Sequence, residues 1–226
     1  MSEEGKKIAV VLSGCGVFDG TEIHEAVLTL LAIEEEGASW HCFAPNVEQM
    51  HVINHTTGEV EEGTKRNVFV ESARIARGGE KLADLAEYDP SEYDAIVFPG
   101  GFGGAKNLSD FAVRGPDAEV NDSVSNAVRS THAMGKPIGF ICITPASVGA
   151  LTLGGEGVKL TIGNDADTAS AVTKCGAEHQ DCKVEDVVID SVNKVVSTPA
   201  YMLGPGVADV RKGISRLISE VLKLTS

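Results

Sequence analysis

One of the cysteines, Cys142, lies between an apolar run and a segment with the composition of a helix start. The apolar run is Ile138 to Ile141, and Thr144, Pro145 and small residues follow the cysteine. A thiol at a sharp strand-to-helix turn lies at the end of a sheet, where the next helix points its N-terminal N–H groups toward it. Helix N-termini lower the pKa of cysteine. The pattern therefore predicts a nucleophilic thiolate at residue 142, against the ordinary alternative of a buried core cysteine.

A glycine-rich stretch, FPGGFGGAKN, offers donors for the negative charge that such a nucleophile creates. Glycine lets the backbone approach a ligand closely, so the N–H groups of Gly100 and Gly101 could turn inward. Together with the N–H of Ile143, the residue after the thiol, they would hold an oxyanion. A plain strand-to-helix turn is the alternative interpretation of these glycines.

The stretch DGTEIHEA places three carboxyl groups, Asp19, Glu22 and Glu25, at a helix start. The spacing of Asp19 and Glu22 suits a capping box, so a structural role is favoured for Glu22. Glu25 lies one turn deeper, and its side chain is expected to lean toward the N-terminal turn. A desolvated carboxyl there has a raised pKa, and as a neutral acid it could hydrogen-bond the thiolate and move protons. A solvated residue on the helix surface is an equally open alternative.

The remaining cysteines and the histidines give weaker signals. The five cysteines, at positions 15, 42, 142, 175 and 182, have no paired spacing, which favours free thiols in a reducing, cytoplasmic setting. Cys15 lies on the first loop and is either a core residue or a disulfide partner for Cys142. Among six histidines, His179 is the one candidate partner for the thiol. No His, Cys or carboxylate set has metal-ligand spacing, so no metal is expected.

Apolar runs of strand length alternate with amphipathic segments of helix length. Strands are expected at Lys7 to Ser13, Trp40 to Ala44, Tyr93 to Phe98, Pro137 to Ile141 and Lys159 to Ile162, and hairpins at Val52 to Glu59, on the sheet edge, and Val184 to Ser197. Helical segments are expected at Glu22 to Glu36, Arg66 to Ala76, Leu82 to Ala86, Ala118 to Met134, Pro145 to Leu151, Asp167 to Lys174 and Val207 to Leu224. The alternation predicts one α/β domain over residues 1–226, with a mainly parallel sheet covered on both faces. Ligands bind beyond the carboxyl ends of such strands, where the three loops would meet.

The charge balance limits the partners. With 33 acidic and 19 basic residues the net charge is −14, which disfavours nucleic acid and anionic membranes. No apolar run approaches the roughly 20 residues of a membrane-spanning helix, and the N-terminus lacks the features of a signal peptide. We therefore expect no nucleic-acid partner, no membrane partner and a cytoplasmic location, with a mature organellar form left open.

The three loops together resemble the class I glutamine amidotransferase-like superfamily, in its protease I and Parkinsonism-associated deglycase branch. GFICITP is similar to the segment that presents the nucleophilic cysteine, Glu25 matches the glutamate that hydrogen-bonds it, and Pro99-Gly100-Gly101 matches the donor loop. Nearly the whole chain resembles the ElbB-type isoprenoid-biosynthesis glyoxalases, also called enhancing lycopene biosynthesis proteins. The stretches that carry this similarity are SGCGVFDGTEIHEA, FPGGFGGAKNLSDFA, PIGFICITPAS, LTIGNDADTA and VVSTPAYM. The resemblance implies a flavodoxin-like doubly wound fold, a homodimer and no cofactor.

The activity implied by the resemblance is that of a glyoxalase, which converts glyoxal-type 1,2-dicarbonyls to 2-hydroxy acids. Cys142 would be the nucleophile and Glu25 the proton shuttle. Other superfamily members carry a histidine after the next strand, where this chain has Asn164 and Asp165. This departure puts amidase and peptidase activity in doubt. A redox-sensing cysteine protein without turnover and a glutamine amidotransferase-like hydrolase are the alternatives.

Overall fold

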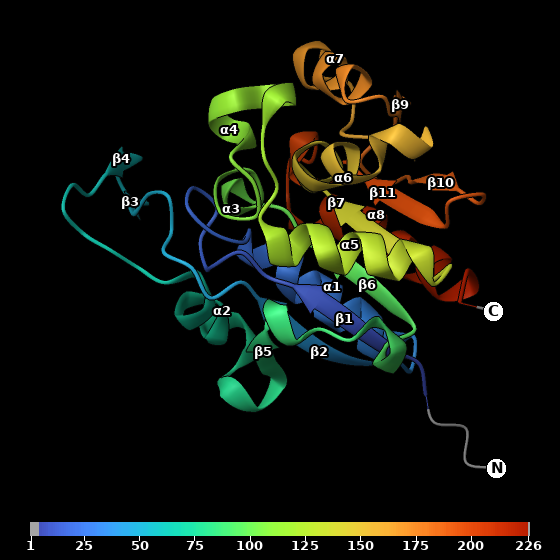
Figure 1. Ribbon diagram of the computed structural model, residues 1–226, viewed down its shortest axis with the longest axis horizontal. Helices are drawn as coiled ribbons and strands as arrows, with labels where there is room; N and C mark the ends of the chain where they lie inside the picture. The colour runs from blue at the N-terminus through green and yellow to red at the C-terminus, as the bar shows by residue number, and fades with distance from the viewer. Residues whose placement is uncertain (1–4, 226) are drawn as a thin grey trace.

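The structure, a computed structural model, describes residues 5–225 and is built around one twisted sheet (Figure 1). Seven strands lie in the order β10-β11-β7-β6-β1-β2-β5, and every neighbouring pair is parallel except β10 and β11. Their bounds are β1 (Lys7–Val11), β2 (Ser39–Ala44), β5 (Leu82–Asp84), β6 (Ala95–Phe98), β7 (Ile138–Ile141), β10 (Val188–Asp190) and β11 (Val195–Thr198). The predicted mainly parallel, doubly wound α/β fold is confirmed.

Helices cover both faces of this sheet (Figure 1). One face carries α1 (Ile23–Glu35), α2 (Val68–Ala76) and α8 (Val207–Lys223). The other face carries α5 (Asp122–Ala133), a π-helix (Pro145–Ala150) that continues into α6 (Leu151–Leu153), and α7 (Ala166–Lys174). Two short helices, α3 (Phe102–Lys106) and α4 (Phe111–Arg114), follow the glycine-rich loop.

Strand β1 shows why these apolar runs form central strands. Ile8 and Val10 point into the core under α1 and α8, whereas Ala9 and Val11 point into the core under α5. Successive side chains of a strand point to opposite faces, so a strand that is buried on both sides needs an unbroken apolar run. The central strand positions predicted from such runs agree with the structure.

Three segments depart from the sequence prediction because tertiary pairing decides them. Leu82 to Ala86, expected to be helical, begins with the edge strand β5, in which Leu82 pairs with Cys42. The hairpin expected near Val52 forms, as β3 (Ile53–Asn54) and β4 (Glu59–Val60), but it is a separate two-stranded ribbon rather than an edge of the sheet. The strand expected at Lys159 forms β8 (Lys159–Leu160), which pairs with β9 (Glu178–His179), also outside the main sheet.

Two helices also differ in detail. The helix expected from Ala118 begins only at Asp122, because the side chain of Asn121 accepts the N–H of Ser123 and caps it. In α1 the apolar residues Ile23, Val27 and Leu31 are exposed, with Val27 at 50%. Glu25 and Thr29 are buried alongside other apolar residues of this helix, so the apolar period alone identifies only part of its buried face.

The turn after β7 is held by a buried threonine. The Thr144 hydroxyl accepts the N–H of Ile141 at 2.9 Å and can donate to the carbonyl of Phe98, on the neighbouring strand, also at 2.9 Å. Thr144 is 0% exposed. A backbone N–H that is buried without a partner is costly, so this hydroxyl fixes how β7 ends before the cysteine.

Replacing Thr144 with valine keeps the shape and removes the hydroxyl. We expect the free energy of unfolding to fall by about 1–3 kcal/mol, because the Ile141 N–H is left without its acceptor. Urea titration at pH 7 measures the change. Thr173 lies on the exposed side of α7 and bonds only the carbonyl of Ala169, so Thr173→Val should stay within about 0.5 kcal/mol of the wild type. Equal losses in the two variants would contradict this account of the turn.

Candidate active site

Cys142 occupies a strained turn at the carboxyl end of β7. Its φ is +64°, in the left-handed region that residues with a β-carbon rarely adopt. Its N–H donates to the carbonyl of Thr198, at the end of β11, at 3.0 Å. Left-handed backbone costs a residue with a β-carbon about 1–2 kcal/mol, and such outliers concentrate at functional sites. The sharp strand-to-helix turn expected from the sequence is therefore present.

The sulfur of Cys142 is the point where three loops meet. The N–H groups of Gly101 and Ile143 and the carboxyl group of Glu25 all lie close enough to the sulfur to change its pKa. Cys142 is only 8% exposed. Gly101 comes from the loop after β6, Ile143 from the turn after β7 and Glu25 from the first turn of α1. The structure thus brings Cys142, Glu25 and the N–H groups of Gly101 and Ile143 together. The N–H of Gly100, also expected to face an oxyanion, donates to Glu25 instead.

Glu25 is a buried carboxyl group with a fixed orientation. It is 0% exposed, its Oε2 accepts the N–H of Gly100 at 2.9 Å, and its Oε1 accepts the N–H of Tyr201 at 3.1 Å. Burial raises the pKa of Glu25 to about 8, and the charge of Glu22 adds to this, while the Tyr201 N–H acts in the opposite direction. Glu25 is consequently protonated at neutral pH and can donate a hydrogen bond. The alternative of a solvated surface residue is wrong.

The expectation of a thiolate with a lowered pKa at Cys142 is wrong. Burial raises the pKa of the Cys142 thiol well above its ordinary value, and a charged Glu25 would raise it further. The N–H groups of Gly101 and Ile143 act in the opposite direction but do not outweigh the removal of the sulfur from water. The resting site is therefore a neutral thiol beside a neutral acid, and any attack by the sulfur must be coupled to transfer of its proton.

Glycine is required at both positions of the donor loop. A β-carbon on Gly100 would lie 2.4 Å from Cβ of Cys142 and 2.5 Å from Oε2 of Glu25. Gly101 has φ +96°, and a β-carbon there would lie 2.3 Å from the backbone nitrogen of Glu22. Because these contacts are with backbone and with the reacting groups, no side chain fits. The loop is therefore more than a plain turn.

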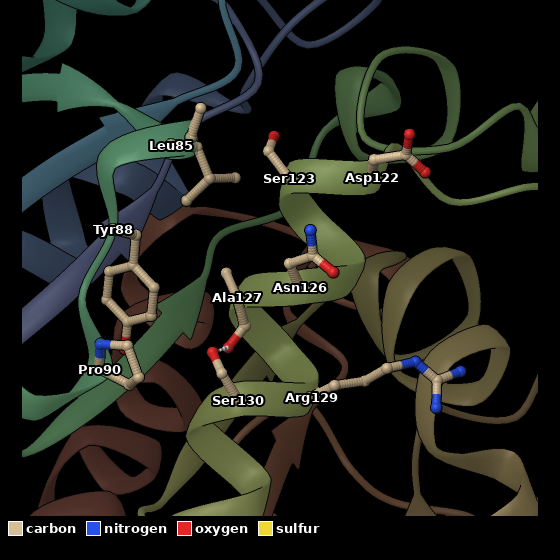
Figure 2. Close-up of a pocket in the computed structure, with 10 residues that line it drawn as sticks. Leu85, Tyr88, Pro90, Asp122, Ser123, Asn126, Ala127, Arg129 and Ser130 are labelled. Carbon is tan, nitrogen blue, oxygen red and sulfur yellow. Dashed lines mark hydrogen bonds between the residues drawn. The ribbon is translucent and has the colours of Figure 1, made fainter.

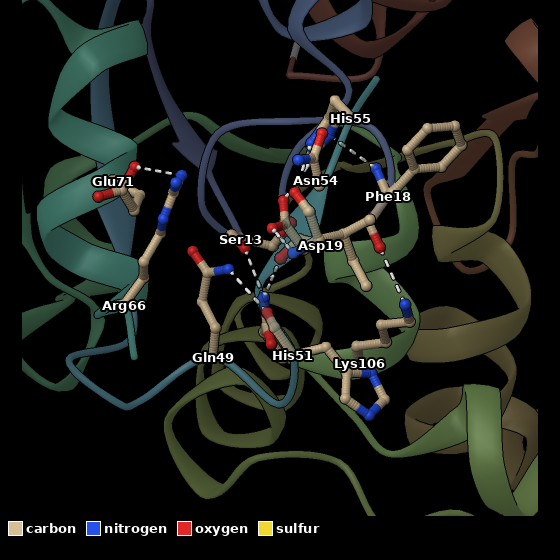
Figure 3. A network of polar contacts seen from close by, with 12 residues as sticks. Ser13, Phe18, Asp19, Gln49, His51, Asn54, His55, Arg66, Glu71 and Lys106 are labelled. Atoms are coloured by element: carbon tan, nitrogen blue, oxygen red, sulfur yellow. Dashed lines mark hydrogen bonds and ion pairs between the residues drawn. The ribbon is translucent and has the colours of Figure 1, made fainter. Parts of the chain in front are cut away.

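A polar network outside the site holds the first loop in place (Figure 3). Asp19, which is buried, accepts the N–H of Ile53 at 2.8 Å and lies 3.8 Å from Nε2 of His55. The Lys106 ammonium donates to the carbonyl of Phe18 at 2.9 Å. The first loop in turn binds the donor loop, because the Gly103 N–H donates to the carbonyl of Gly20 at 2.8 Å.

This network corrects the predicted capping box. Asp19 binds the segment around Ile53 rather than pairing with Glu22. Glu22 itself caps α1, because its Oε2 accepts the N–H of Glu25 at 2.7 Å. The predicted structural role of Glu22 is thus present in a different form, and its charge also faces Glu25.

Two candidate residues are not brought to the sulfur. Cys15 is half-buried and faces Glu71 of α2, and all five cysteines are free thiols, so the structure contains no bond between Cys15 and Cys142. His179 accepts the N–H of Ile162 through Nε2 at 3.3 Å and lies 3.8 Å from Asp181. None of the hydrogen bonds within residues 5–225 links His179 to Cys142.

Tyr201 is the contributor that the sequence analysis missed. It follows β11, which lies directly beside β7 in the sheet and runs parallel to it. The rule that loops at the carboxyl ends of neighbouring strands share a site would have included Tyr201. The sequence gives β11 as one arm of a hairpin, however, and its neighbour on the other side becomes known only with the fold.

A separate cavity of about 740 Å³ lies between the segment after β5 and α5 (Figure 2). Leu85, Tyr88, Asn126 and Ser130 are among its lining residues. Burial raises the pKa of Tyr88 to about 12, and its hydroxyl lies 2.9 Å from that of Thr131. Its phenol therefore stays neutral, and the cavity presents no activated group.

The described part of the chain contains neither a metal centre nor a membrane span. Within residues 5–225, no group of three or more His, Cys, Asp or Glu side chains is arranged to hold a metal ion. No helix in this part of the chain is long and apolar enough to cross a bilayer.

Known proteins have sequences similar to this one over nearly its full length. No family model matches. The chain is 46% identical over 228 residues to the Homo sapiens glutamine amidotransferase-like class 1 domain-containing protein 3, mitochondrial, an alignment covering 97% of this chain and 83% of that protein.

Two solved structures with the same fold differ in how similar their sequences are to this chain. An isoprenoid biosynthesis protein with an amidotransferase-like domain from Ehrlichia chaffeensis has a TM-score of 0.88 at 39% identity, covering 96% of this chain and 99% of that one. Glyoxalase III from Candida albicans has a TM-score of 0.60 at 12% identity, covering 97% of each chain, and this second likeness concerns the fold alone.

The raised pKa of Glu25 has a measurable effect on stability. The pKa of a glutamate in the unfolded chain is about 4.3, whereas the pKa of Glu25 in the folded chain is about 8. Between these values the folded state holds the proton more tightly than the unfolded state, so stability is lost as the pH rises through this window. Glu25→Gln cannot ionise, and we expect it to gain stability relative to the wild type between pH 5 and pH 8, as measured by urea titration. Glu36→Gln, an exposed control at the C-cap of the same helix, should follow the wild type, and parallel pH curves for all three proteins would contradict the burial argument.

Proposed function

The chain belongs to the family of glutamine amidotransferase-like class 1 domain-containing proteins, and from this premise we propose that it is a cofactor-independent glyoxalase. The observation that carries the proposal is the position of a buried, neutral Glu25 beside the Cys142 thiol, since a β-carbon on Gly100 would touch both groups. The N–H groups of Gly101 and Ile143 also act on the sulfur. The likeness to the isoprenoid biosynthesis protein supports placement among the isoprenoid-biosynthesis glyoxalases, and a glyoxalase among the fold neighbours is consistent with this chemistry.

The burial of the thiol favours a small substrate. Because Cys142 is 8% exposed, the reacting carbon must belong to a group small enough to reach the sulfur. A side chain at Gly100 would already collide with both reacting groups. An aldehyde carbon of glyoxal or a similar 1,2-dicarbonyl meets this condition, whereas a peptide bond within a folded chain does not.

In the first step the sulfur bonds to an aldehyde carbon and the carbonyl oxygen gains a proton. A neutral carboxylic acid has one oxygen that donates and one that accepts, so Glu25 can protonate the oxygen while it takes the thiol proton. The N–H groups of Gly101 and Ile143 hold the oxygen as charge develops on it. The product is a hemithioacetal, and Glu25 returns to its neutral state.

In the second step a proton moves between the two carbons of the bound substrate. Glu25 accepts the proton from the carbon that carries the sulfur and protonates the neighbouring carbonyl oxygen, giving an enediol. Glu25 then gives a proton to the second carbon and takes the hydroxyl proton from the carbon that carries the sulfur, which leaves a thioester of a 2-hydroxy acid and a neutral Glu25. No electron leaves the substrate, because one carbon is oxidised as its neighbour is reduced.

In the last step water attacks the thioester carbon and the C–S bond breaks. The leaving sulfur takes a proton and regenerates the Cys142 thiol. With glyoxal the sum is glyoxal plus water giving glycolic acid. The raised pKa of Cys142 makes the thiol, rather than the thiolate, the form that is restored at the end of the cycle.

The two rival functions fit the site less well. A glutamine amidotransferase-like hydrolase needs a base to activate the cysteine, and His179 contacts Ile162 and Asp181 instead. A redox sensor requires an accessible thiolate, whereas Cys142 is buried and its pKa is raised.

We propose that the protein works in a reducing compartment, cytoplasmic or organellar, where its thiols stay free.

Purified protein should convert glyoxal to glycolate without glutathione or metal, as followed by loss of the dicarbonyl and by product chromatography. We expect Cys142→Ala to abolish turnover and Glu25→Gln to lower kcat by about 10²–10⁴-fold, the usual contribution of a general acid–base group. Cys175→Ala removes a thiol outside the site and should retain full activity. Turnover that survives in Cys142→Ala would refute the assignment, and release of ammonia from glutamine would favour the hydrolase.

Mild peroxide distinguishes the enzyme from a sensor. Because the Cys142 thiol is buried and mostly protonated, we expect it to oxidise no faster than the half-buried thiols of Cys15 and Cys182. Intact and peptide mass spectrometry after a timed exposure measures the order of oxidation. Selective, early conversion of Cys142 to a sulfinic acid would support the sensor instead.

A further inference from the structure

His24 and Tyr201 form a hydrogen-bonded pair beside Glu25. Nδ1 of His24 lies 2.8 Å from the Tyr201 hydroxyl oxygen, and the two ring centroids are 5.8 Å apart. The His24 side chain is 55% exposed. His24 immediately precedes Glu25 on α1, but the two side chains leave the helix in directions about 100° apart, so any effect of His24 on Glu25 must pass through another residue.

Tyr201 contacts α1 at two places. Its backbone N–H donates to Oε1 of Glu25 at 3.1 Å, and its hydroxyl meets His24. The preceding residue, Ala200, is fully buried and has φ +44°. Left-handed backbone at an alanine costs about 1–2 kcal/mol, so the short helical turn Ala200–Met202 needs contacts outside itself to keep this conformation.

We propose that His24 is a positioning residue: by holding the Tyr201 hydroxyl, it keeps the Tyr201 N–H on Oε1 of Glu25 and thereby sets the protonation state of the acid beside Cys142. Only the effect of His24 on catalysis rests on the proposed function. The contacts from His24 to Tyr201 and from Tyr201 to Glu25 do not depend on a substrate.

The groups that face Glu25 determine in which direction the loss of the Tyr201 N–H changes its pKa. Within the described chain, these are the carboxyl of Glu22 on α1, the thiol of Cys142, the N–H of Gly100 and the N–H of Tyr201. A donated N–H stabilises the carboxylate, and the Tyr201 N–H is the largest influence that lowers the pKa of Glu25. Loss of this donor therefore keeps Glu25 protonated to higher pH.

The test is a titration of Glu25 itself in full-length protein labelled with ¹³C at the glutamate carboxyl carbon. Its resonance is assigned by its absence from Glu25→Gln, and the midpoint is followed by NMR between pH 5 and pH 10. We expect Tyr201→Phe and His24→Ala each to raise the midpoint by roughly one pH unit, the worth of a hydrogen bond to a charged group.

Two further variants separate positioning from charge and from general loosening. His24→Asn keeps a hydrogen-bonding atom near the place of Nδ1 without an ionisable ring, so it should restore the wild-type midpoint. His132→Ala removes the contact of His132, on α5, with Asn193, in the turn between β10 and β11, and should leave the midpoint unchanged.

An unchanged midpoint in Tyr201→Phe, or a midpoint that His24→Asn fails to restore, overturns the proposal. Parallel assays on glyoxal distinguish the two hypotheses. A shifted titration without turnover in the wild type refutes the glyoxalase and leaves the positioning role intact. Turnover with no shift in the titration refutes the positioning role alone.

Discussion

The site depends on a carboxyl group that is kept away from water. Glu25 is fully buried, and each of its oxygens accepts one backbone N–H, from Gly100 and from Tyr201. Burial opposes its ionisation more strongly than the two donors favour it, so the acid stays neutral at physiological pH. A neutral acid can donate to a sulfur or to a carbonyl oxygen, which a carboxylate cannot do.

The surrounding architecture serves to hold this acid against the thiol. The parallel strands β6, β7 and β11 end at the same edge of the sheet and deliver the glycine loop, Cys142 and Tyr201 to one place. The first loop is tied to the glycine loop by the bond from Gly103 to Gly20. Cys142 and Ala200 are two of the four non-glycine residues with positive φ in the described chain, and Ala200 directly precedes the N–H donor of Glu25 at Tyr201. Such strain persists only where neighbouring contacts over-determine the backbone.

The neutral resting state of both groups shapes the chemistry that the site can perform. A pre-formed thiolate suits displacement reactions, whereas a neutral thiol beside a neutral acid suits additions in which one proton is passed around a ring of atoms. Addition to an aldehyde followed by a proton shift between adjacent carbons is of this kind. The small exposed fraction of Cys142 also means that electrostatic interactions at the sulfur are stronger than they would be in water.

The sequence by itself determined the mainly parallel sheet and the sharp turn at Cys142, because apolar runs and turn residues are local signals. It offered Glu25, Gly100 and Gly101 as candidates, each with a structural alternative. It could not determine that Glu25 lies on the buried face of α1, the edge strand at Leu82, the neighbour of β11 or the protonation of Cys142. These depend on which surfaces come to face one another, and a pKa depends on how much water is removed from a group. Only the tertiary structure decided them, since burial is a property of the packed chain and not of any segment within it.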